Sequence, residues 1–170
     1  MIKQVKGKRI EIKILSAEDR IEIEQIKELF IEYTKSLAIN LDFQNIRSEL
    51  ETLPGKYVKP DGLLILALVD DQTAGCIALR KLEGNICEMK RLFVRDTFRG
   101  YGIGRSLISF LINEAKQMNY EFMRLDTLDT MKAAQNLYVS YGFYDIEPYT
   151  FNPINGARFM ELNLLSNKKK

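Results

Sequence analysis

The sequence contains no histidine. Histidine is the side chain that most often exchanges protons near neutral pH, and it is a frequent metal ligand. Its absence excludes serine–histidine and cysteine–histidine hydrolases. The spacing of the two cysteines, Cys76 and Cys87, is not that of a metal-binding pair either. Proton transfer must therefore use carboxylate, tyrosine, lysine or cysteine side chains, or water, and we expect no metal.

The sequence also lacks a strong excess of one charge and a long hydrophobic run. The formal net charge is +2 over 170 residues, so the composition does not indicate nucleic acid or a membrane surface as a partner. The first residues contain no apolar signal region, and no apolar run is long enough to span a bilayer. We therefore expect a cytoplasmic protein of one domain, with reduced, buried cysteines and a solvated tail at residues 168–170.

Hydrophobic periodicity predicts an α/β chain with a mostly antiparallel sheet. Strands are expected at residues 9–15, 63–69, 73–82, 86–94, 122–127, 143–146 and 157–164. Helices are expected after the capping signal Ser16–Asp19, at about residues 43–52, at 102–117 and at 130–140. The strands between residues 63 and 94 are joined by short turns and should be antiparallel. The long helix that follows them allows the strand at 122–127 to lie parallel to its predecessor.

A glycine-rich loop joins the strand at 86–94 to the helix at 102–117. It reads Arg99-Gly100-Tyr101-Gly102-Ile103-Gly104-Arg105. The start of a helix leaves backbone N–H groups unpaired and carries a partial positive charge. Glycines let a phosphate approach those N–H groups without meeting a Cβ atom. The loop therefore indicates a phosphate or pyrophosphate site, although its glycine spacing is neither that of a dinucleotide fingerprint nor that of a nucleotide hydrolase loop.

Two motifs carry a resemblance to a known family. The stretch Arg99–Gly104 resembles the acyl-CoA pyrophosphate loop of the GNAT superfamily of N-acetyltransferases, whose pattern is Arg/Gln-x-x-Gly-x-Gly/Ala. The stretch Ala134–Phe143 resembles the family's second motif, Ala-x-x-Leu-Tyr-x-x-x-Gly-Phe. The resemblance covers about residues 11–164 and is sharpest from Glu88 to Phe143. One departure is Met131, which stands where many members carry an asparagine, and this affects any CoA contact of that side chain.

The resemblance implies a single N-acetyltransferase domain over residues 1–170. The implied fold is GNAT-like, with a mixed, mostly antiparallel central sheet, helices on both faces and a splayed pair of parallel strands. The implied cosubstrate is acetyl-CoA, and the implied reaction is direct acetyl transfer, in a ternary complex, to a primary amine of a small molecule or peptide. The identity of that acceptor, the acyl-chain preference and a homodimeric state are left open.

The resemblance also implies which residues bind the cosubstrate. The backbone of the strand end would contact the pantetheine arm, and one N–H group there would polarise the thioester carbonyl. The glycine loop would hold the pyrophosphate. The implied contacts are, in chain order, Leu92, Phe93, Val94, Arg99, Gly100, Tyr101, Gly102, Ile103, Gly104 and Arg105.

Tyr138 and Glu88 are the candidate catalytic residues. Tyr138 aligns with a tyrosine that family members place near the thioester sulfur. Since a phenol has a pKa near 10 and a thiol near 8.5, it would protonate or hydrogen-bond the departing thiolate. Glu88 begins the strand that binds the cofactor arm, where some members use a glutamate as base, often through water. Asp126 is a second candidate base. The plainer interpretations are a packing tyrosine and an exposed strand-end glutamate.

Arg91 and Arg124 would favour a carboxylate-bearing acceptor if they line the acceptor cleft, but we expect them to be solvated. Two other functions remain open at this point. One is a CoA-binding regulatory module without catalysis, against which the presence of Tyr138 and Glu88 argues. The other is a nucleotide phosphate-binding protein, against which the missing Lys-Ser/Thr ending of the loop argues.

Overall fold

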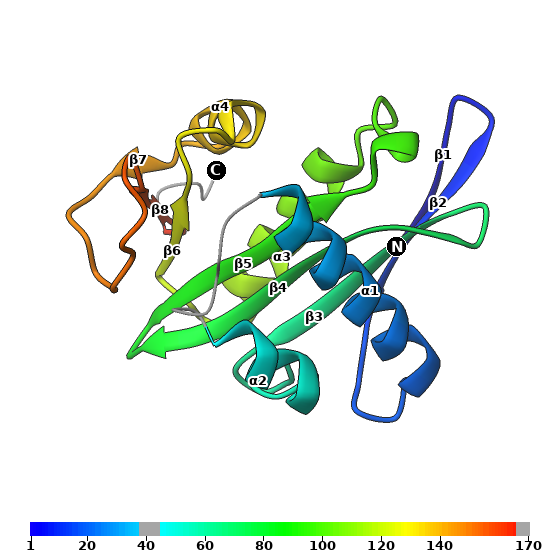
Figure 1. Cartoon of the computed structure of the whole chain (residues 1–170), viewed down its shortest axis with the longest axis horizontal. Helices are drawn as coiled ribbons and strands as arrows, with labels where there is room; N and C mark the ends of the chain where they lie inside the picture. The colour runs from blue at the N-terminus through cyan, green and yellow to red at the C-terminus, as the bar shows by residue number, and fades with distance from the viewer. Residues whose placement is uncertain (38–44, 166–170) are drawn as a thin grey trace.

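The computed structural model describes residues 1–37 and 45–165. Eight strands form one sheet in the order β1-β2-β3-β4-β5-β6-β8-β7, shown in Figure 1. The strands are β1 (Ile2–Val5), β2 (Lys8–Ile14), β3 (Leu63–Val69), β4 (Gln72–Glu83), β5 (Ile86–Val94), β6 (Phe122–Thr127), β7 (Tyr144–Asp145) and β8 (Arg158–Asn163). The helices are α1 (Arg20–Ser36), α2 (Ile46–Thr52), the 3₁₀ turn η2 (Asp96–Phe98), α3 (Ile103–Gln117) and α4 (Lys132–Ser140).

The alternating and apolar runs form strands where the sequence predicts them. The predicted strand and helix segments reappear with ends shifted by a few residues. Strand β1 was not predicted, because four residues at an edge carry too little alternation, and it is held by antiparallel pairing with β2. The predicted helix at 43–52 begins at Ile46 in the structure, and Phe43 lies outside the described residues, as does the tail at 168–170.

The predicted capping signal Ser16–Asp19 forms a turn rather than the cap of α1. The Asp19 carboxylate accepts hydrogen bonds from the Ser16 N–H at 2.7 Å and from the Ser16 hydroxyl at 3.1 Å. Asp19 is the residue before the helix, and it makes no side-chain capping bond to the first turn. The polar side chains therefore fold back on the preceding loop, and α1 begins at Arg20.

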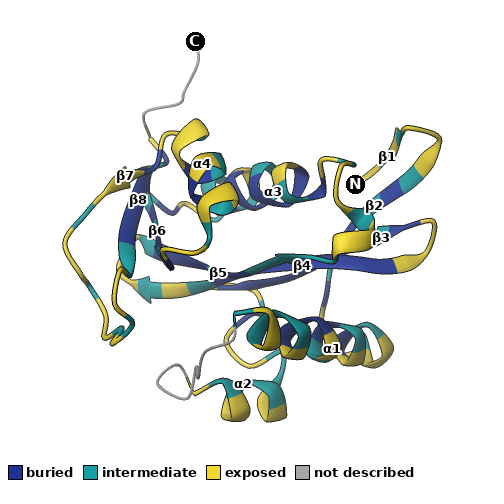
Figure 2. Cartoon of the chain, turned by 45° about the horizontal axis from the view of Figure 1, so that its top comes forward, coloured by how far each residue is buried: buried dark blue, intermediate teal, exposed yellow. Residues whose placement is uncertain are grey.

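Helices cover both faces of the sheet. Figure 2 shows α1 and α2 on one face and α3 and α4 on the other. Strand β3 illustrates how one strand contributes apolar side chains to both faces of the sheet. Leu63, Ile65 and Ala67 pack towards α3, whereas Leu64 and Leu66 belong to the cluster with α1. A nearly continuous apolar run has side chains on both faces of the pleat, so it is stable only when both faces are covered.

One of the seven adjacent strand pairs differs in direction from the rest. Strands β5 and β6 are parallel, as the crossover through α3 predicted, and every other pair is antiparallel. The register of the parallel pair runs from Ile86↔Phe122 to Glu88↔Arg124 and ends there. Beyond that point β5 pairs with β4 and β6 pairs with β8. The two strands separate towards α3 and α4, as Figure 1 shows.

Both cysteines are buried free thiols in strands, as expected. Burial raises the pKa of the Cys76 thiol and of the Cys87 thiol, so neither is a ready nucleophile near neutral pH. In the part of the chain that the structure describes, no helix has the length and apolar character needed to cross a membrane.

Candidate active site

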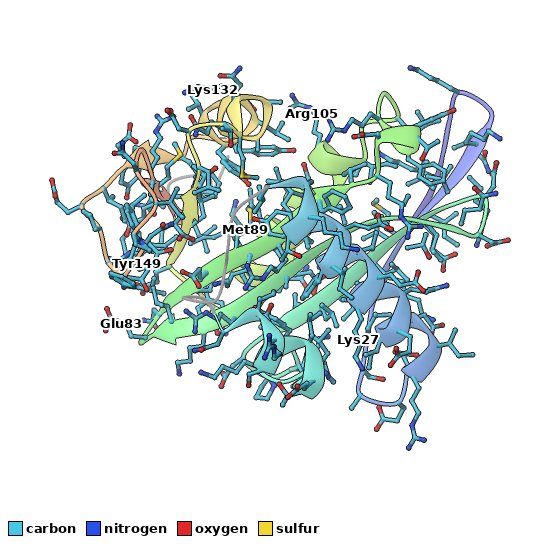
Figure 3. The ribbon with its side chains drawn as sticks, in the orientation of Figure 1. Lys27, Glu83, Met89, Arg105, Lys132 and Tyr149 are labelled. Carbon is cyan, nitrogen blue, oxygen red and sulfur yellow. The ribbon has the colours of Figure 1, made fainter. Side chains whose placement is uncertain are left out.

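The separation of β5 and β6 creates the central feature of the site. A narrow cavity lies between the two strands, and we call it the central cavity. It is lined by residues of both strands and of the neighbouring helices and loops, among them Tyr33, Met89, Lys90, Leu92, Leu125, Asp126, Met131, Tyr138 and Asn152. Figure 3 labels Met89 on β5 beside this opening. Beyond Glu88, the backbone N–H and C=O groups on the β6 side of β5 are not paired with β6 in the described structure. An extended ligand could pair with them as an added strand.

A β-bulge directs the end of β5 towards this opening. The register with β4 shifts between Cys76↔Phe93 and Ala78↔Lys90, and Arg91 has a positive φ of 61°. One extra residue in a strand bends it and turns its side chains. Beyond the bulge, Phe93 and Val94 still pair with β4, and residues 92–94 form part of the wall of a surface groove.

We call that surface the glycine groove. It has a volume of about 540 Å³ and runs between the end of β5, the loop before α3 and the start of α4. Gly100 and Gly102 have φ values of 90° and 70°, which side chains rarely allow. A Cβ built on Gly102 would meet no protein atom within 4 Å, so the space above it is open. The loop conformation and the open space both suit a phosphate at the N-terminus of α3.

Two helix starts and several cations surround the glycine groove. Helices α3 and α4 both begin at its wall, and Arg99, Arg105 and Lys132 line it. Figure 3 labels Arg105 and Lys132 at the starts of these two helices, at the top of the view. Helix N-termini and cations both favour anions, so the groove fits a pyrophosphate.

The residues predicted for the cofactor meet at this groove, with one exception. Leu92, Phe93, Val94, Arg99, Gly100, Gly102, Ile103, Gly104 and Arg105 all line it. Tyr101 does not. Its ring packs against the apolar core, with the ammonium of Lys6 5.8 Å from the ring centroid. Met131, the departure from the family pattern, lines the groove with an apolar thioether where many members carry an amide.

Tyr138 lies on α4 and lines the central cavity. Its side chain is buried, and its ring packs on Phe143 with the centroids 5.7 Å apart. No residue in the described ranges hydrogen-bonds its hydroxyl, which leaves that group for a ligand atom. Burial raises the pKa of Tyr138 well above that of an ordinary phenol. The hydroxyl therefore keeps its proton and is a donor at neutral pH.

A pocket of about 410 Å³ lies on the other side of the central cavity. We call it the charged pocket. Its wall includes Glu49, Tyr57, Arg80, Glu88, Lys90 and Asp126, with Thr150 and Phe151 from the loop between β7 and β8. Such a concentration of ionisable groups in a concave surface is typical of a functional site.

Glu88 is buried at 1 % exposure rather than exposed at a strand end. Its carboxylate accepts hydrogen bonds from Arg80 Nε at 2.8 Å and from the Tyr149 hydroxyl at 2.6 Å, and Lys90 Nζ lies 3.7 Å away. Burial alone would raise the pKa of Glu88. The cations of Lys90 and Arg80, with the Tyr149 hydrogen bond, outweigh burial and hold that pKa below its usual value. Glu88 is therefore a stabilised anion and a weak proton acceptor.

The expectation of solvated arginines is wrong for Arg91. Its side chain is 2 % exposed, and its Nε donates to Glu49 at 2.8 Å. Arg91 lines the central cavity, and Arg124 lines neither cavity. Arg124 is ion-paired with Glu161 at 2.8 Å and stacks over Tyr149. The cations that line the charged pocket are instead Arg80, Lys90 and Lys56, which the sequence analysis did not single out.

The groove, the central cavity and the charged pocket adjoin one another, because neighbouring ones share lining residues. Leu92 and Met131 line both the groove and the central cavity. Lys90 and Asp126 line both the central cavity and the charged pocket. Asp126 accepts a hydrogen bond from Asn152 Nδ2 at 2.9 Å. A molecule bound along the groove would therefore present its far end, through the strand gap, to a molecule in the charged pocket.

Sequence reasoning missed Tyr149 and Asn152, although both touch the candidate bases. They lie in the connection between β7 and β8, more than twenty residues from Asp126 and sixty from Glu88. Pro148 and the nearby polar residues indicated a loop and gave no sign of what the loop contacts. Only a weak indication in the sequence assigns Lys90 to the site: it lies two residues from Glu88, on the same face of a strand.

Comparison with known proteins identifies the family. The profile of the acetyltransferase (GNAT) family matches residues 23–143. An uncharacterised N-acetyltransferase of Dictyostelium discoideum is 34 % identical over 90 % of this chain and 99 % of its own length. A GNAT-family acetyltransferase of Staphylococcus aureus has a similar structure, with a TM-score of 0.75, 27 % identity and coverage of 91 % of this chain and 99 % of its own.

A second solved structure has a similar fold and a known ligand. The PaiA N-acetyltransferase of Thermoplasma acidophilum, in complex with coenzyme A, has a TM-score of 0.68 at 20 % identity and covers 91 % of this chain and 98 % of its own. The family assignment agrees with the eight-stranded sheet, its one parallel pair and the glycine loop. The chain belongs to the GNAT family of acetyltransferases and is an acyltransferase.

Proposed function

We propose that the protein transfers an acetyl group from acetyl-CoA directly to a primary amine in a ternary complex. The observation that carries the proposal is the row of adjoining cavities from the glycine groove, past Tyr138, to the charged pocket. Separate cavities for donor and acceptor on the two sides of the strand gap would let both bind at once, so a covalent acetyl-enzyme intermediate is not required. The CoA-bound relative from Thermoplasma acidophilum supports CoA as the group that fits the groove.

Each part of the path would have one task. The N–H groups at the starts of α3 and α4, with Arg99, Arg105 and Lys132, would bind the pyrophosphate. Residues 92–94 would bind the extended arm through their free backbone edge and polarise the thioester carbonyl. Tyr101 would support the loop from the core side, because it packs away from the groove.

Tyr138 would serve the leaving thiolate. Its hydroxyl has no hydrogen bond within the described residues, and it lines the cavity through which the thioester would pass. A protonated phenol next to a developing thiolate stabilises it by hydrogen bonding or by proton transfer.

The two carboxylates would divide the work on the acceptor amine. Glu88 is fixed by Arg80 and Tyr149 and favours a positive charge in the pocket without taking its proton. Asp126 lies at the junction of the central cavity and the charged pocket, so we assign it the proton of the attacking amine, directly or through water.

The test combines binding and turnover. Acetyl-CoA at a hundredfold excess over Kd should stabilise the protein by about 2.7 kcal/mol, and ATP should leave the melting temperature unchanged. Free-thiol release with a panel of amines should then give turnover. Stabilisation without turnover on any amine would indicate a CoA-binding regulatory module. Stabilisation by ATP and not by acetyl-CoA would indicate a nucleotide-binding protein and would overturn the proposal.

A further inference from the structure

Lys90 is a nearly buried cation of the proposed site for which the described residues provide no hydrogen-bond acceptor. Its side chain is 13 % exposed, and its charged partner is Glu88 Oε1 at 3.7 Å. That same oxygen accepts the hydrogen bond of Arg80 Nε at 2.8 Å. Within residues 1–37 and 45–165, Lys90 makes no hydrogen bond. A nearly buried ammonium group with three donors is costly unless something binds it.

Charged side chains of both signs surround Lys90 within the described residues. Arg91 on the same strand and Arg80 on β4 repel the ammonium. Glu88, also on β5, and Asp126 on β6 attract it. Each of the two nearest arginines already has its own carboxylate, because Arg80 pairs with Glu88 and Arg91 pairs with Glu49. Burial first and Arg91 second lower the pKa of Lys90. An anion brought in by a ligand would act against both effects, because its charge attracts the ammonium.

Asp126 gives the complementary charge at the same place. Lys90 projects from β5 and Asp126 from β6, and both line the central cavity as well as the charged pocket. The two side chains form no ion pair with each other in the described part of the chain. Asp126 Oδ2 is held by Asn152, which orients the carboxylate. The junction where acetyl transfer would occur therefore presents one cation and one anion side by side.

We propose that the acceptor is an amino acid, bound by its α-carboxylate to Lys90 and with its amine at Asp126. This inference rests on the proposed acetyl transfer and names the class of its acceptor. An ammonium and a carboxylate attached to the same α-carbon match a Lys–Asp pair that lines one junction without forming an ion pair in the described structure. Simple alkylamines and peptide N-termini lack the neighbouring carboxylate and would give the Lys90 ammonium no hydrogen-bond acceptor. Discrimination is strong when the missing group leaves a buried polar partner unsatisfied.

The remaining volume would take the side chain of the amino acid. The charged pocket extends from the junction to Tyr57 and Lys56 on one side and to Thr150 and Phe151 on the other. Its volume of about 410 Å³ exceeds what one backbone carboxylate and amine occupy. The site therefore fixes the α-carbon groups through Lys90 and Asp126 and leaves the side chain to the pocket wall.

The experiment compares each amino acid with its own α-amide. The panel contains small, acidic, basic and aromatic side chains, and kcat/KM is measured for both members of each pair with saturating acetyl-CoA. For the best side chain, we expect the wild-type protein to prefer the acid by at least tenfold. The amide has the more readily deprotonated amine, so this preference runs against intrinsic reactivity. In Lys90→Met the ratio of kcat/KM for the acid to kcat/KM for the amide should fall to within threefold of one. The change should come from a higher KM for the acid. Lys90→Arg should restore part of the ratio.

Lys81→Met is the matched control, because Lys81 is an exposed lysine on β4 outside the three cavities, and it should keep the wild-type ratio. A ratio taken on one protein is insensitive to partial unfolding. Equal or better use of the amides by the wild-type protein overturns the inference. So does a preference for acids that survives in Lys90→Met. In both cases acetyl transfer itself stands, whereas the absence of turnover on every acid, amide and alkylamine would mean that the proposed function has failed.

Discussion

Arg80 and Glu88 lie directly opposite each other on β4 and β5, and Arg80 Nε donates to Glu88 Oε1 at 2.8 Å. The side chain of Glu88 is 1 % exposed and that of Arg80 is 26 % exposed. This cross-strand pair forms part of the wall of the charged pocket and fixes Glu88 as an anion. Its effect on stability and its effect on catalysis can be measured separately.

The Arg80–Glu88 pair should stabilise the fold in a pH-dependent way. The pKa of Glu88 in the folded state lies below its ordinary value. The stabilisation is therefore complete above the unfolded value, about pH 4.3, and is lost as the pH falls through the folded value. Glu88→Gln should lower the free energy of unfolding by about 2 kcal/mol at pH 7. The difference from wild type should shrink below about pH 4.

Urea unfolding at pH 7, 5 and 3.5 gives these values. Glu83→Gln is the control, because Glu83 is an exposed glutamate at the end of the same strand as Arg80, and Figure 3 labels it at the tip of the hairpin. A Glu88→Gln difference that stays constant or grows on acidification would contradict an ionised, paired Glu88.

The pH–rate profile should distinguish the two carboxylates. Asp126→Asn should slow acetylation mainly on the acid side, because raising the pH generates the free amine without a base. Glu88→Gln should slow the reaction by a similar factor at every pH, because Glu88 acts by its charge. The measurement is kcat/KM against pH with one saturating cosubstrate. A defect of Glu88→Gln that disappears at high pH would assign the base to Glu88 after all.

The conformation of Gly102 should be needed for cofactor binding. Its φ of 70° is strained for any β-branched residue, and a side chain there would enter the space above the loop. Gly102→Val should weaken CoA binding at least tenfold, about 1.4 kcal/mol. Gly84→Val is a matched control, since Gly84 has a φ of 49° and open space around it in a turn away from the groove. Calorimetric titration that finds equal CoA affinity in the two folded variants would remove the loop from the site.

The fold and the gathering of the predicted residues at the glycine groove were predictable because their signals are local. Period-two alternation, turn residues and the helical stripe of α3 act over a few positions, and the glycines and arginines of the loop are consecutive in the sequence. Tyr101 shows the limit of this reasoning. Its neighbours face the groove, but its own side chain packs inward because the loop turns at Gly100 and Gly102.

The charged pocket was only partly predictable, because its contacts join distant segments. Arg91 and Lys90 are adjacent in the sequence, and the bulge decides which of them is paired with α2 and which lines the pocket. The Tyr149 hydroxyl reaches Glu88 across 61 positions of sequence. Such pairings depend on the register of strands and on the path of loops, and neither follows from the residue types alone.

The most direct test of the account is the hydroxyl of Tyr138. Tyr138→Phe keeps the ring and its packing on Phe143 and removes the hydroxyl that would serve the leaving thiolate. Turnover should fall by a factor of about 10² to 10⁴, while the Kd for CoA changes less than about threefold. Tyr120→Phe, which removes another buried hydroxyl that donates to the backbone of Asp61, should affect stability but not turnover. If Tyr138→Phe acetylates the acceptor at the wild-type rate, Tyr138 is a packing residue and the proposed path of the reaction past it is wrong.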